Sequence, residues 1–428
     1  MEIDFQYGKK GLKFTIPDKL NITILEPQEH KELENPIDAI YKSLLNPINS
    51  KPLDKILDHK KNANIIVVIE DHTRPMPTKP ILEALVRLFK EKNINDNQVK
   101  ILVGTGLHRN PNPDELEHMV GLEIINRFDI IFHNAKDSKN LEYIGKTKFG
   151  TEVYLNSNYV NSDLKIITGY VEPHFFAGFS GGRKAIIPGI AGTETILSNH
   201  SAKNIHGNAK FGELNGNKVH EDAIEAVKLP KAKPDFCINV LINSQHKITT
   251  VASGNVFSVH NTLVQKLQNV CFKTFKEPFD IVLCGNGGYP LDLNLYQAVK
   301  SMAIGELAAK QGGYIIAINE CKDGIGQDEF KKLINSGKTP EQLYNGALDG
   351  SIKVPDIWEI QILARILMKH KVFVISSMEQ KDLGNIGLLY VENVETAINE
   401  IISEINKPLD QIKVLVLPKG PVILPKIV

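Results

Sequence analysis

The sequence predicts an α/β protein of two domains, each built on a mostly parallel sheet, with an active-site cleft between them. Short runs of branched apolar residues alternate with segments of helical period, which is typical of a parallel sheet covered by helices. The length of 428 residues allows two or three such cores at roughly 100 to 200 residues each. A polar, proline-containing stretch near residues 266–278 interrupts the alternation. We therefore assign residues 1–268 to an N-terminal α/β domain and residues 269–428 to a C-terminal one.

The apolar runs of the first domain, such as NIIVVIE at residues 64–70, are typical of buried strands. Strands are expected at residues 64–70, 98–103, 129–132, 152–155, 164–168, 235–242 and 248–253. Helices are expected at residues 78–92, 113–120 and 258–268. The helix at 113–120 has a clear start signal, because Asn112 can cap it and Pro113 suits its first position.

The same alternation resumes in the second domain. Strands are expected at residues 279–284, 314–319, 371–376 and 413–417, and helices at 295–311, within 327–370 and at 394–405. Trp358 lies in an apolar helical segment and is expected to be a packing residue.

The composition excludes several classes of function. The chain has 50 Lys and Arg against 50 Asp and Glu, so it lacks the basic surface of a nucleic-acid binder. Its start has no secretory pattern, and its apolar runs are shorter than the roughly 20 residues that span a bilayer. The four cysteines are spaced too widely for a disulfide framework or a thiolate metal site. We expect a cytoplasmic protein that binds neither nucleic acid nor membrane; a homodimer is compatible with the sequence.

Histidines or arginines follow three of the predicted strands. These loops contain DHTRP (71–75), GTGLHR (104–109) and GYVEPH (169–174). Ligands of open α/β sheets collect at the carboxyl ends of the strands, where these loops are expected to meet. A single histidine there is more often an ordinary hydrogen-bonded residue, whereas three such loops give the functional interpretation equal weight. GTG does not continue into a dinucleotide-binding loop, because Arg109 occupies the position of the third glycine.

The richest stretch is FFAGFSGGRKAIIPGIAGTETILSNH, residues 175–200. Its glycines, including Gly181 and Gly182, leave the backbone amides accessible to an anion, beside the cations Arg183 and Lys184. Ala185 stands where a phosphate-binding Walker loop needs Ser or Thr. A lysine that is partly desolvated among cations has a lowered pKa and is a candidate for covalent attachment; the alternative is a surface lysine in a salt bridge.

A helix over residues 193–201 leads to His200, a candidate metal ligand. His206 is six residues further along, which is not a spacing for two ligands on one helix face. Any partners of His200 must therefore come from elsewhere, such as a bound cofactor, and imidazole suits nickel, zinc or copper. The remaining histidines of this region are expected to be ordinary surface or hydrogen-bonded residues: His118, His133, His206 and His220.

In the second domain, Tyr296 and Lys300 are one helical turn apart, so a phenol and an ammonium can reach one anion together. The alternative is a surface pair without a ligand. Together, DHTRP, GTGLHR, EPHFFAGFSGGRKAIIPGIAG (172–192), SNH (198–200) and YQAVK (296–300) resemble the lactate racemase family. The resemblance covers both domains in order, and the glycine-lysine stretch with its flanking histidines is its most specific part.

This resemblance implies a nickel-pincer nucleotide, a pyridinium mononucleotide that holds nickel through two sulfur-containing arms and is built by separate maturation proteins. It implies that Lys184 is the tether, His200 the nickel ligand, and His108 and His174 the acid/base pair. Arg74 and Lys300 would hold the substrate carboxylate, and Tyr296 and Gln297 would line the site. Asp71 would orient Arg74 or the cofactor ribose, and Gly181, Gly182 and Arg183 would contact the cofactor.

The implied activity is interconversion of D- and L-lactate through hydride transfer and a pyruvate intermediate. Two enantiomers present their hydroxyl groups on opposite sides, so two bases are needed, and an imidazole titrates near neutrality. One alternative is a racemase or epimerase of another 2-hydroxy acid with the same cofactor. A non-catalytic nucleotide- or metal-binding protein is another, although it would need no second histidine.

Overall fold

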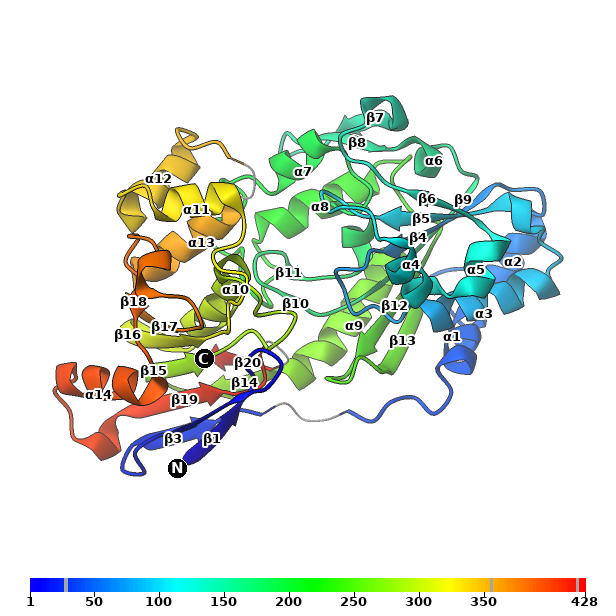
Figure 1. Cartoon of the computed structure of the whole chain (residues 1–428). Coiled ribbons are helices and arrows are strands. Elements are labelled where there is room, and N and C mark those ends of the chain that lie inside the picture. The colour runs from blue at the N-terminus through cyan, green and yellow to red at the C-terminus, as the bar shows by residue number, and fades with distance from the viewer. Residues whose placement is uncertain (27–29, 355–356, 421–422) are drawn as a thin grey trace. The chain divides into compact units, whose positions relative to one another are not determined.

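The computed structural model describes residues 1–26, 30–354, 357–420 and 423–428 (Figure 1). The chain forms two compact units. The first unit comprises Glu29–His200 and Asn204–Gln268, and the second comprises Met1–Gln28, Ser201–Lys203 and Asn269–Val428. Residues 1–26, which we assigned to the N-terminal domain, thus pack with the C-terminal part of the chain.

The first unit is built on a six-stranded sheet. Its strand order is β13 (Ile248–Gly254), β12 (Phe236–Ile242), β9 (Leu164–Tyr170), β4 (Ile65–Glu70), β5 (Val99–Gly104) and β6 (Asp129–Phe132). Every neighbouring pair is parallel except β12 and β13, which form an antiparallel edge. The predicted α/β class with mostly parallel sheets is confirmed.

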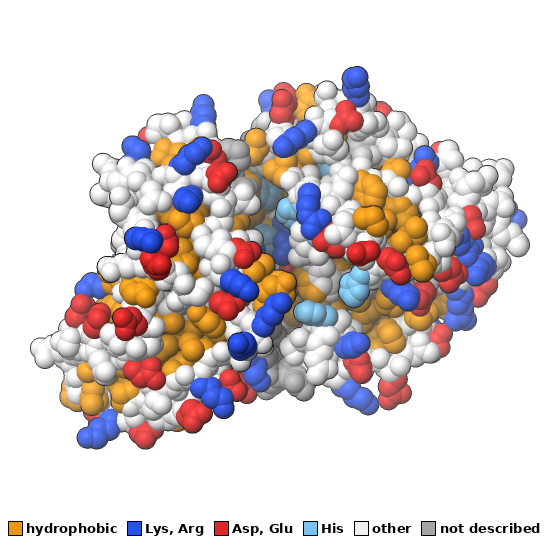
Figure 2. All heavy atoms as spheres, viewed as in Figure 1, with side chains coloured by type: hydrophobic (Ala, Val, Ile, Leu, Met, Phe, Trp, Pro, Cys, Tyr) orange, Lys and Arg blue, Asp and Glu red, His pale blue; other side chains and the backbone are white. Residues whose placement is uncertain are grey.

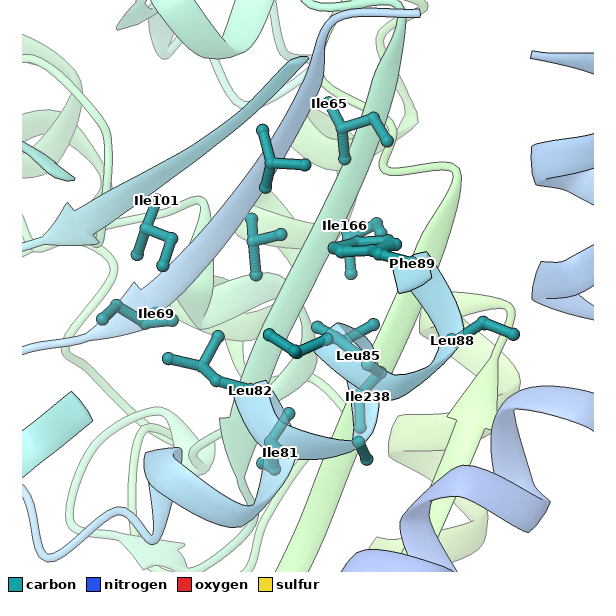
Figure 3. Packing of buried hydrophobic residues seen from close by; sticks show 14 of the residues in the cluster. Ile65, Ile69, Ile81, Leu82, Leu85, Leu88, Phe89, Ile101, Ile166 and Ile238 are labelled. Atoms are coloured by element: carbon teal, nitrogen blue, oxygen red, sulfur yellow. The ribbon is translucent and has the colours of Figure 1, made fainter. Parts of the chain in front are cut away.

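Helices and short elements surround this sheet. The helices are α1 (Pro36–Leu45), α2 (Leu53–His59), α3 (Thr78–Glu91), α4 (Pro113–Val120), α5 (Leu122–Arg127), α6 (Ser157–Val160), α7 (Thr193–Asn199), α8 (Lys218–Lys228) and α9 (Val256–Cys271). Figure 3 shows Leu85 and Phe89 of α3 packed toward Ile166 and Ile238 of the sheet, and all four side chains are buried. Each buried Leu, Ile or Phe contributes about 1.5 to 3 kcal/mol to folding.

One predicted strand of the first unit lies outside the main sheet. β8 (Glu152–Asn156) pairs with β7 (Leu141–Lys146) in a separate antiparallel pair, and β7 was not predicted. A second short pair consists of β10 (Pro173–His174) and β11 (Gly178–Phe179). It is followed by the one-turn helix η3 (Gly182–Ala185), so the glycine-lysine stretch is an ordered loop of short elements.

The second unit has its own six-stranded sheet, in which every neighbouring pair is parallel. Its strand order is β18 (Leu389–Tyr390), β17 (Lys371–Ile375), β16 (Ala309–Ile318), β15 (Phe279–Cys284), β19 (Lys413–Leu417) and β3 (Asn21–Ile24). The N-terminal segment belongs here because β3 extends the sheet beside β19. The hairpin of β1 (Glu2–Phe5) and β2 (Leu12–Thr15) buries Phe5 and Phe14 in the same core.

The remaining elements of the second unit are α10 (Leu295–Glu306), α11 (Asp328–Ile334), α12 (Pro340–Asp349), α13 (Ile357–Leu367), α14 (Val394–Glu404), β14 (Phe272–Phe275) and β20 (Leu424–Ile427). β14 pairs with β20, so part of the predicted polar break is a strand. Trp358, the expected packing residue, is half-buried on α13.

The described residues contain no helix that is both long and apolar enough to cross a membrane. Figure 2 shows acidic and basic side chains interspersed over the visible surface of each unit, in keeping with the balanced charge. All four cysteines are buried and form no disulfide, and burial raises the pKa of the Cys237, Cys271, Cys284 and Cys321 thiols.

Candidate active site

The loops that carry the predicted histidines meet at one edge of the first unit's sheet. They follow β4, β5 and β9, which are parallel neighbours and so have their carboxyl ends at the same edge. Backbone hydrogen bonds connect two of these loops to the glycine-lysine stretch. The Gly106 amide donates to the Gly189 carbonyl at 3.0 Å, and the Ser180 amide donates to the Glu172 carbonyl at 2.8 Å.

Asp71 forms a hydrogen-bonded pair with His108. Its Oδ2 lies 2.7 Å from His108 Nδ1, while its Oδ1 accepts hydrogen bonds from the amide and hydroxyl of Thr73. Burial alone would raise the pKa of Asp71, but the hydrogen bonds from His108 and Thr73 outweigh it, and the pKa is lowered. An ionised Asp71 can only accept, so His108 carries its proton on Nδ1, and the neutral ring offers its lone pair on Nε2.

The sequence did not indicate this contact, and the role expected for Asp71 remains a prediction. The sequence placed its carboxylate next to Arg74 or a ribose, whereas the structure turns it toward His108 and Thr73. The guanidinium of Arg74 lies 3.6 Å from Glu172 Oε1, at the start of the loop that carries His174. Both side chains of this pair are about one-third exposed, so the ion pair is open to exchange with another carboxylate.

His174 is buried, and its own loop holds its ring. The amide of Ala177 donates to His174 Nδ1 at 3.2 Å. Because that nitrogen is an acceptor, the neutral ring carries its proton on Nε2. Phe175 stacks on the ring with 5.2 Å between centroids, and Phe176 meets it edge-on at 4.6 Å. The Ala177 amide and the rings of Phe175 and Phe176 therefore help to orient His174.

Phe176 also brings Lys184 and His200 together. Lys184 Nζ lies 5.7 Å from the centroid of the Phe176 ring, and His200 meets the same ring edge-on at 5.0 Å. Burial, together with the charges of Arg183 and Arg74, lowers the pKa of Lys184 well below its ordinary value. Burial and the Lys184 charge lower the pKa of His200 to about 3. Lys184 and His200 therefore lie near one ring, and both have lowered pKa values.

Arg183 and Gly182 have partners within the protein, while the contacts predicted between this stretch and the cofactor remain a prediction. Arg183 is 1% exposed, and its guanidinium donates to the carbonyls of Ala177, Ser180 and Gly181 and to His260 Nε2. The Gly182 amide donates to Asn239 Oδ1 at 2.7 Å, so a protein side chain already holds it. A Cβ on Gly181 would lie 2.8 Å from Val171, and the glycine has a φ of +72°. These contacts and the positive φ of Gly181 stabilise the conformation of the loop.

The predicted residues of the second unit lie together on α10. Lys300 Nζ donates to Gln297 Oε1 at 2.6 Å, and Tyr296 meets Phe330 edge-on with 5.6 Å between centroids. Asn294 caps the helix by accepting from the Gln297 amide, which fixes the first turn. Lys300 thus contacts Gln297 within its own unit, and the anion that Lys300 and Tyr296 would share remains a prediction.

The sequence analysis missed four residues that organise this site. Thr73 donates a hydrogen bond to Asp71, and Glu172 pairs with Arg74. Phe176 contacts Lys184 and His200, and His260 accepts a hydrogen bond from Arg183. The first three lie within the quoted motifs, next to residues that were selected, and this adjacency was the available signal. Nothing in the local sequence marks His260, because it lies on α9, far along the chain from η3.

Family models match both halves of the chain. The lactate racemase N-terminal domain matches residues 7–212, and the lactate racemase C-terminal domain matches residues 274–424. A lactate racemase from Thermoanaerobacterium thermosaccharolyticum is 37% identical over 97% of this chain and 99% of its own length. The chain belongs to the lactate racemase family. The predicted membership is confirmed, and with it the class of enzyme, an isomerase.

Further relatives agree with this assignment. A lactate racemase from Lactiplantibacillus plantarum is 34% identical, covering 98% of each chain. The solved lactate racemase apoprotein from T. thermosaccharolyticum has a TM-score of 0.89 at 35% identity, with both chains fully covered. A solved Thermotoga maritima protein has a TM-score of 0.66 at 18% identity, covering 93% of this chain and 100% of that one, and it shares the fold.

Proposed function

We propose that this chain interconverts D- and L-lactate by reversible hydride transfer, with pyruvate as the intermediate and a nickel-pincer nucleotide attached to Lys184. Membership of the lactate racemase family supports racemisation. The observation that carries the finer proposal is the packing of Lys184, His174 and His200 around the single ring of Phe176.

The residues of this cluster fit such a cofactor. Burial and the nearby cations lower the pKa of the Lys184 amine, which favours the unprotonated form that can attack a carboxyl-derived carbon. A buried imidazole with a pKa of about 3 stays neutral, which is the form that binds a metal ion. The described residues contain no group of three or more His, Cys, Asp or Glu that could hold a metal. His200 would therefore complete a coordination sphere supplied mainly by the cofactor.

When bound, the nickel-pincer nucleotide supplies a reversible acceptor for the α-hydrogen as hydride, leaving a planar keto acid that can be reduced from either face. His108 is prepared to take the hydroxyl proton, because Asp71 holds the ring with Nε2 as the basic nitrogen. His174 begins with its proton on Nε2 and can donate a hydrogen bond to the substrate oxygen. For His174 to act as the base toward the other enantiomer, its Nδ1 must release the Ala177 amide, a contact at the long end of the hydrogen-bond range.

Arg74 is the proposed anchor for the substrate carboxylate. Its planar guanidinium can hold a carboxylate through two parallel hydrogen bonds, and its weak pairing with Glu172 is the contact that substrate would replace. We propose that Lys300, Tyr296 and Gln297 of α10 contribute further contacts to the substrate, as the family resemblance implies.

Isotope retention tests the proposal. Matured protein, co-produced with the cofactor-building proteins, is given L-lactate deuterated at C2 in ordinary water. Hydride transfer keeps deuterium at C2 of the D-lactate product, whereas α-proton abstraction replaces it with solvent hydrogen, and mass spectrometry separates the two. Rapid loss of the label would refute hydride transfer. The same assay on other 2-hydroxy acids tests the substrate, and His108→Ala and His174→Ala should each abolish racemisation.

A further inference from the structure

The first unit contains a cavity that is not lined by any of the proposed catalytic or metal-binding residues. Its volume is about 280 Å³, it is partly open to solvent, and it is lined by Arg183 of η3 together with side chains of α8 and α9. The polar groups at its wall include His220 and Lys228 of α8 and His260 of α9. None of its lining residues is acidic.

Arg183 places an uncompensated positive charge at this wall. The side chain is 1% exposed, and no acidic side chain of the described residues acts on the pKa of its guanidinium. Its hydrogen bonds go to three carbonyls and to His260, and its Nε has no hydrogen-bond partner in the described part of the chain. A buried charge without a counter-ion is costly, and burial lowers the pKa of Arg183 to about 9.

The two histidines at the wall are also potential donors. Their rings stack with 6.0 Å between centroids, and His220 Nδ1 is buried with no hydrogen-bond partner among the described residues. Burial and the Arg183 charge lower the pKa of both rings, to about 3 for His220. Lys228 adds a second positive charge, although it is shared with Glu225 at 2.9 Å. The wall thus has unused donors and excess positive charge.

We propose that this cavity binds a small oxyanion, either phosphate or a short carboxylate, held by Arg183, His220 and Lys228. An anion would neutralise the buried guanidinium and accept from the nitrogens that lack partners. The cavity has the volume of several water molecules, at about 30 Å³ each in the liquid, so a tetrahedral ion fits with its hydration. This site is separate from the one proposed for the substrate and does not depend on it.

Calorimetric titration of the full chain tests the site. Inorganic phosphate and acetate are titrated separately at low ionic strength in a buffer free of other oxyanions, and saturable binding is expected for at least one. His220→Leu combined with Lys228→Met should weaken that binding at least tenfold. Lys228→Met alone changes an exposed residue and should weaken it about threefold. Lys218→Met, at the exposed start of α8, makes the same charge change away from the cavity and should have no effect.

Arg74→Gln separates this site from the substrate site. If phosphate or acetate binds at the cavity, the affinity in Arg74→Gln equals that of the wild type even if the proposed racemase mechanism is wrong. Absence of saturable binding to the wild type would overturn the inference. So would equal weakening by Lys218→Met, or loss of binding in Arg74→Gln with full binding in the cavity variants.

Discussion

The carboxylate of Asp71 lies 2.7 Å from Nδ1 of His108, on a loop that follows a different strand. The side chain of Asp71 is 4% exposed, whereas the side chain of His108 is 53% exposed. A buried carboxylate therefore orients an imidazole ring that solvent can reach. Such a pair sets the proton on Nδ1 and stabilises the imidazolium that forms when Nε2 takes a proton.

Asp71→Asn should lower kcat by roughly 10²-fold or more, because general-base catalysis contributes about 10² to 10⁴ and the amide can stabilise the wrong tautomer. KM should change little, since Asp71 is not expected to touch the substrate. Steady-state racemisation by matured protein measures both constants. Thr73→Val removes one hydrogen bond to Asp71 but keeps the pair with His108, and should cost much less. An unchanged kcat in Asp71→Asn would contradict the assigned role.

Lys184→Arg should prevent attachment of the cofactor, because a guanidinium keeps the charge but is a poor nucleophile. Intact-protein mass spectrometry of chains matured in parallel should show an adduct on the wild type and none on the variant. Lys210→Arg, an exposed change further along the chain, is the matched control and should carry the adduct. An adduct of undiminished yield on Lys184→Arg would move the tether to another residue.

His260→Leu should destabilise the first unit by about 1 to 3 kcal/mol, because it removes an acceptor from the buried Arg183 guanidinium. His260→Gln retains an acceptor and should lose less. His59→Leu changes an exposed histidine on α2 and is expected to stay within about 0.5 kcal/mol. Urea unfolding measures all three free energies. Equal losses for His260→Leu and His59→Leu would show that the contact with Arg183 contributes nothing.

Glu70→Gln should stabilise the protein at alkaline pH. Burial raises the pKa of Glu70 to about 8, with Arg74 opposing that shift, so the folded protein binds a proton that the unfolded chain has released above about pH 4.5. The wild type therefore loses stability as the pH rises toward 8, and glutamine removes this cost. The melting temperature of the variant should exceed that of the wild type at pH 8 and approach it near pH 4.5. Glu123→Gln, an exposed control, should show no such trend, and a gain confined to low pH would refute the assignment.

The elements with strong local patterns were predictable from the sequence. β4, α3, β5 and α4 lie where their apolar periods and capping residues indicated, within a residue or two. The convergence of the three loops followed from the rule that parallel neighbours end at one edge. These predictions depend on short-range patterns and on general topology.

Contacts between distant segments were not predictable in the same way. The partner of Asp71 could not be read from the sequence, because Thr73, Arg74 and His108 were all plausible and the choice depends on how β5 lies beside β4. The buried position of the Arg183 guanidinium depends on its hydrogen bond to His260, which lies on α9, far along the chain. The adjacent Lys184 is surrounded by other groups, among them Arg74 and Glu70. The strands β1 to β3 were missed because each has only four residues, and β3 takes its place from β19 near the other end of the chain.

The pairing of β3 with β19 makes the second unit dependent on both termini. During synthesis, nearly the whole of the first unit leaves the ribosome as one continuous segment and can begin to fold. The strands β1 to β3 are synthesised first but cannot join their sheet until β19 has been made. Until then, the apolar residues Phe5, Phe14 and Ile16 are not buried in their core. This delay exposes an aggregation-prone segment, so the nascent chain is expected to need protection by a chaperone until β19 has been synthesised.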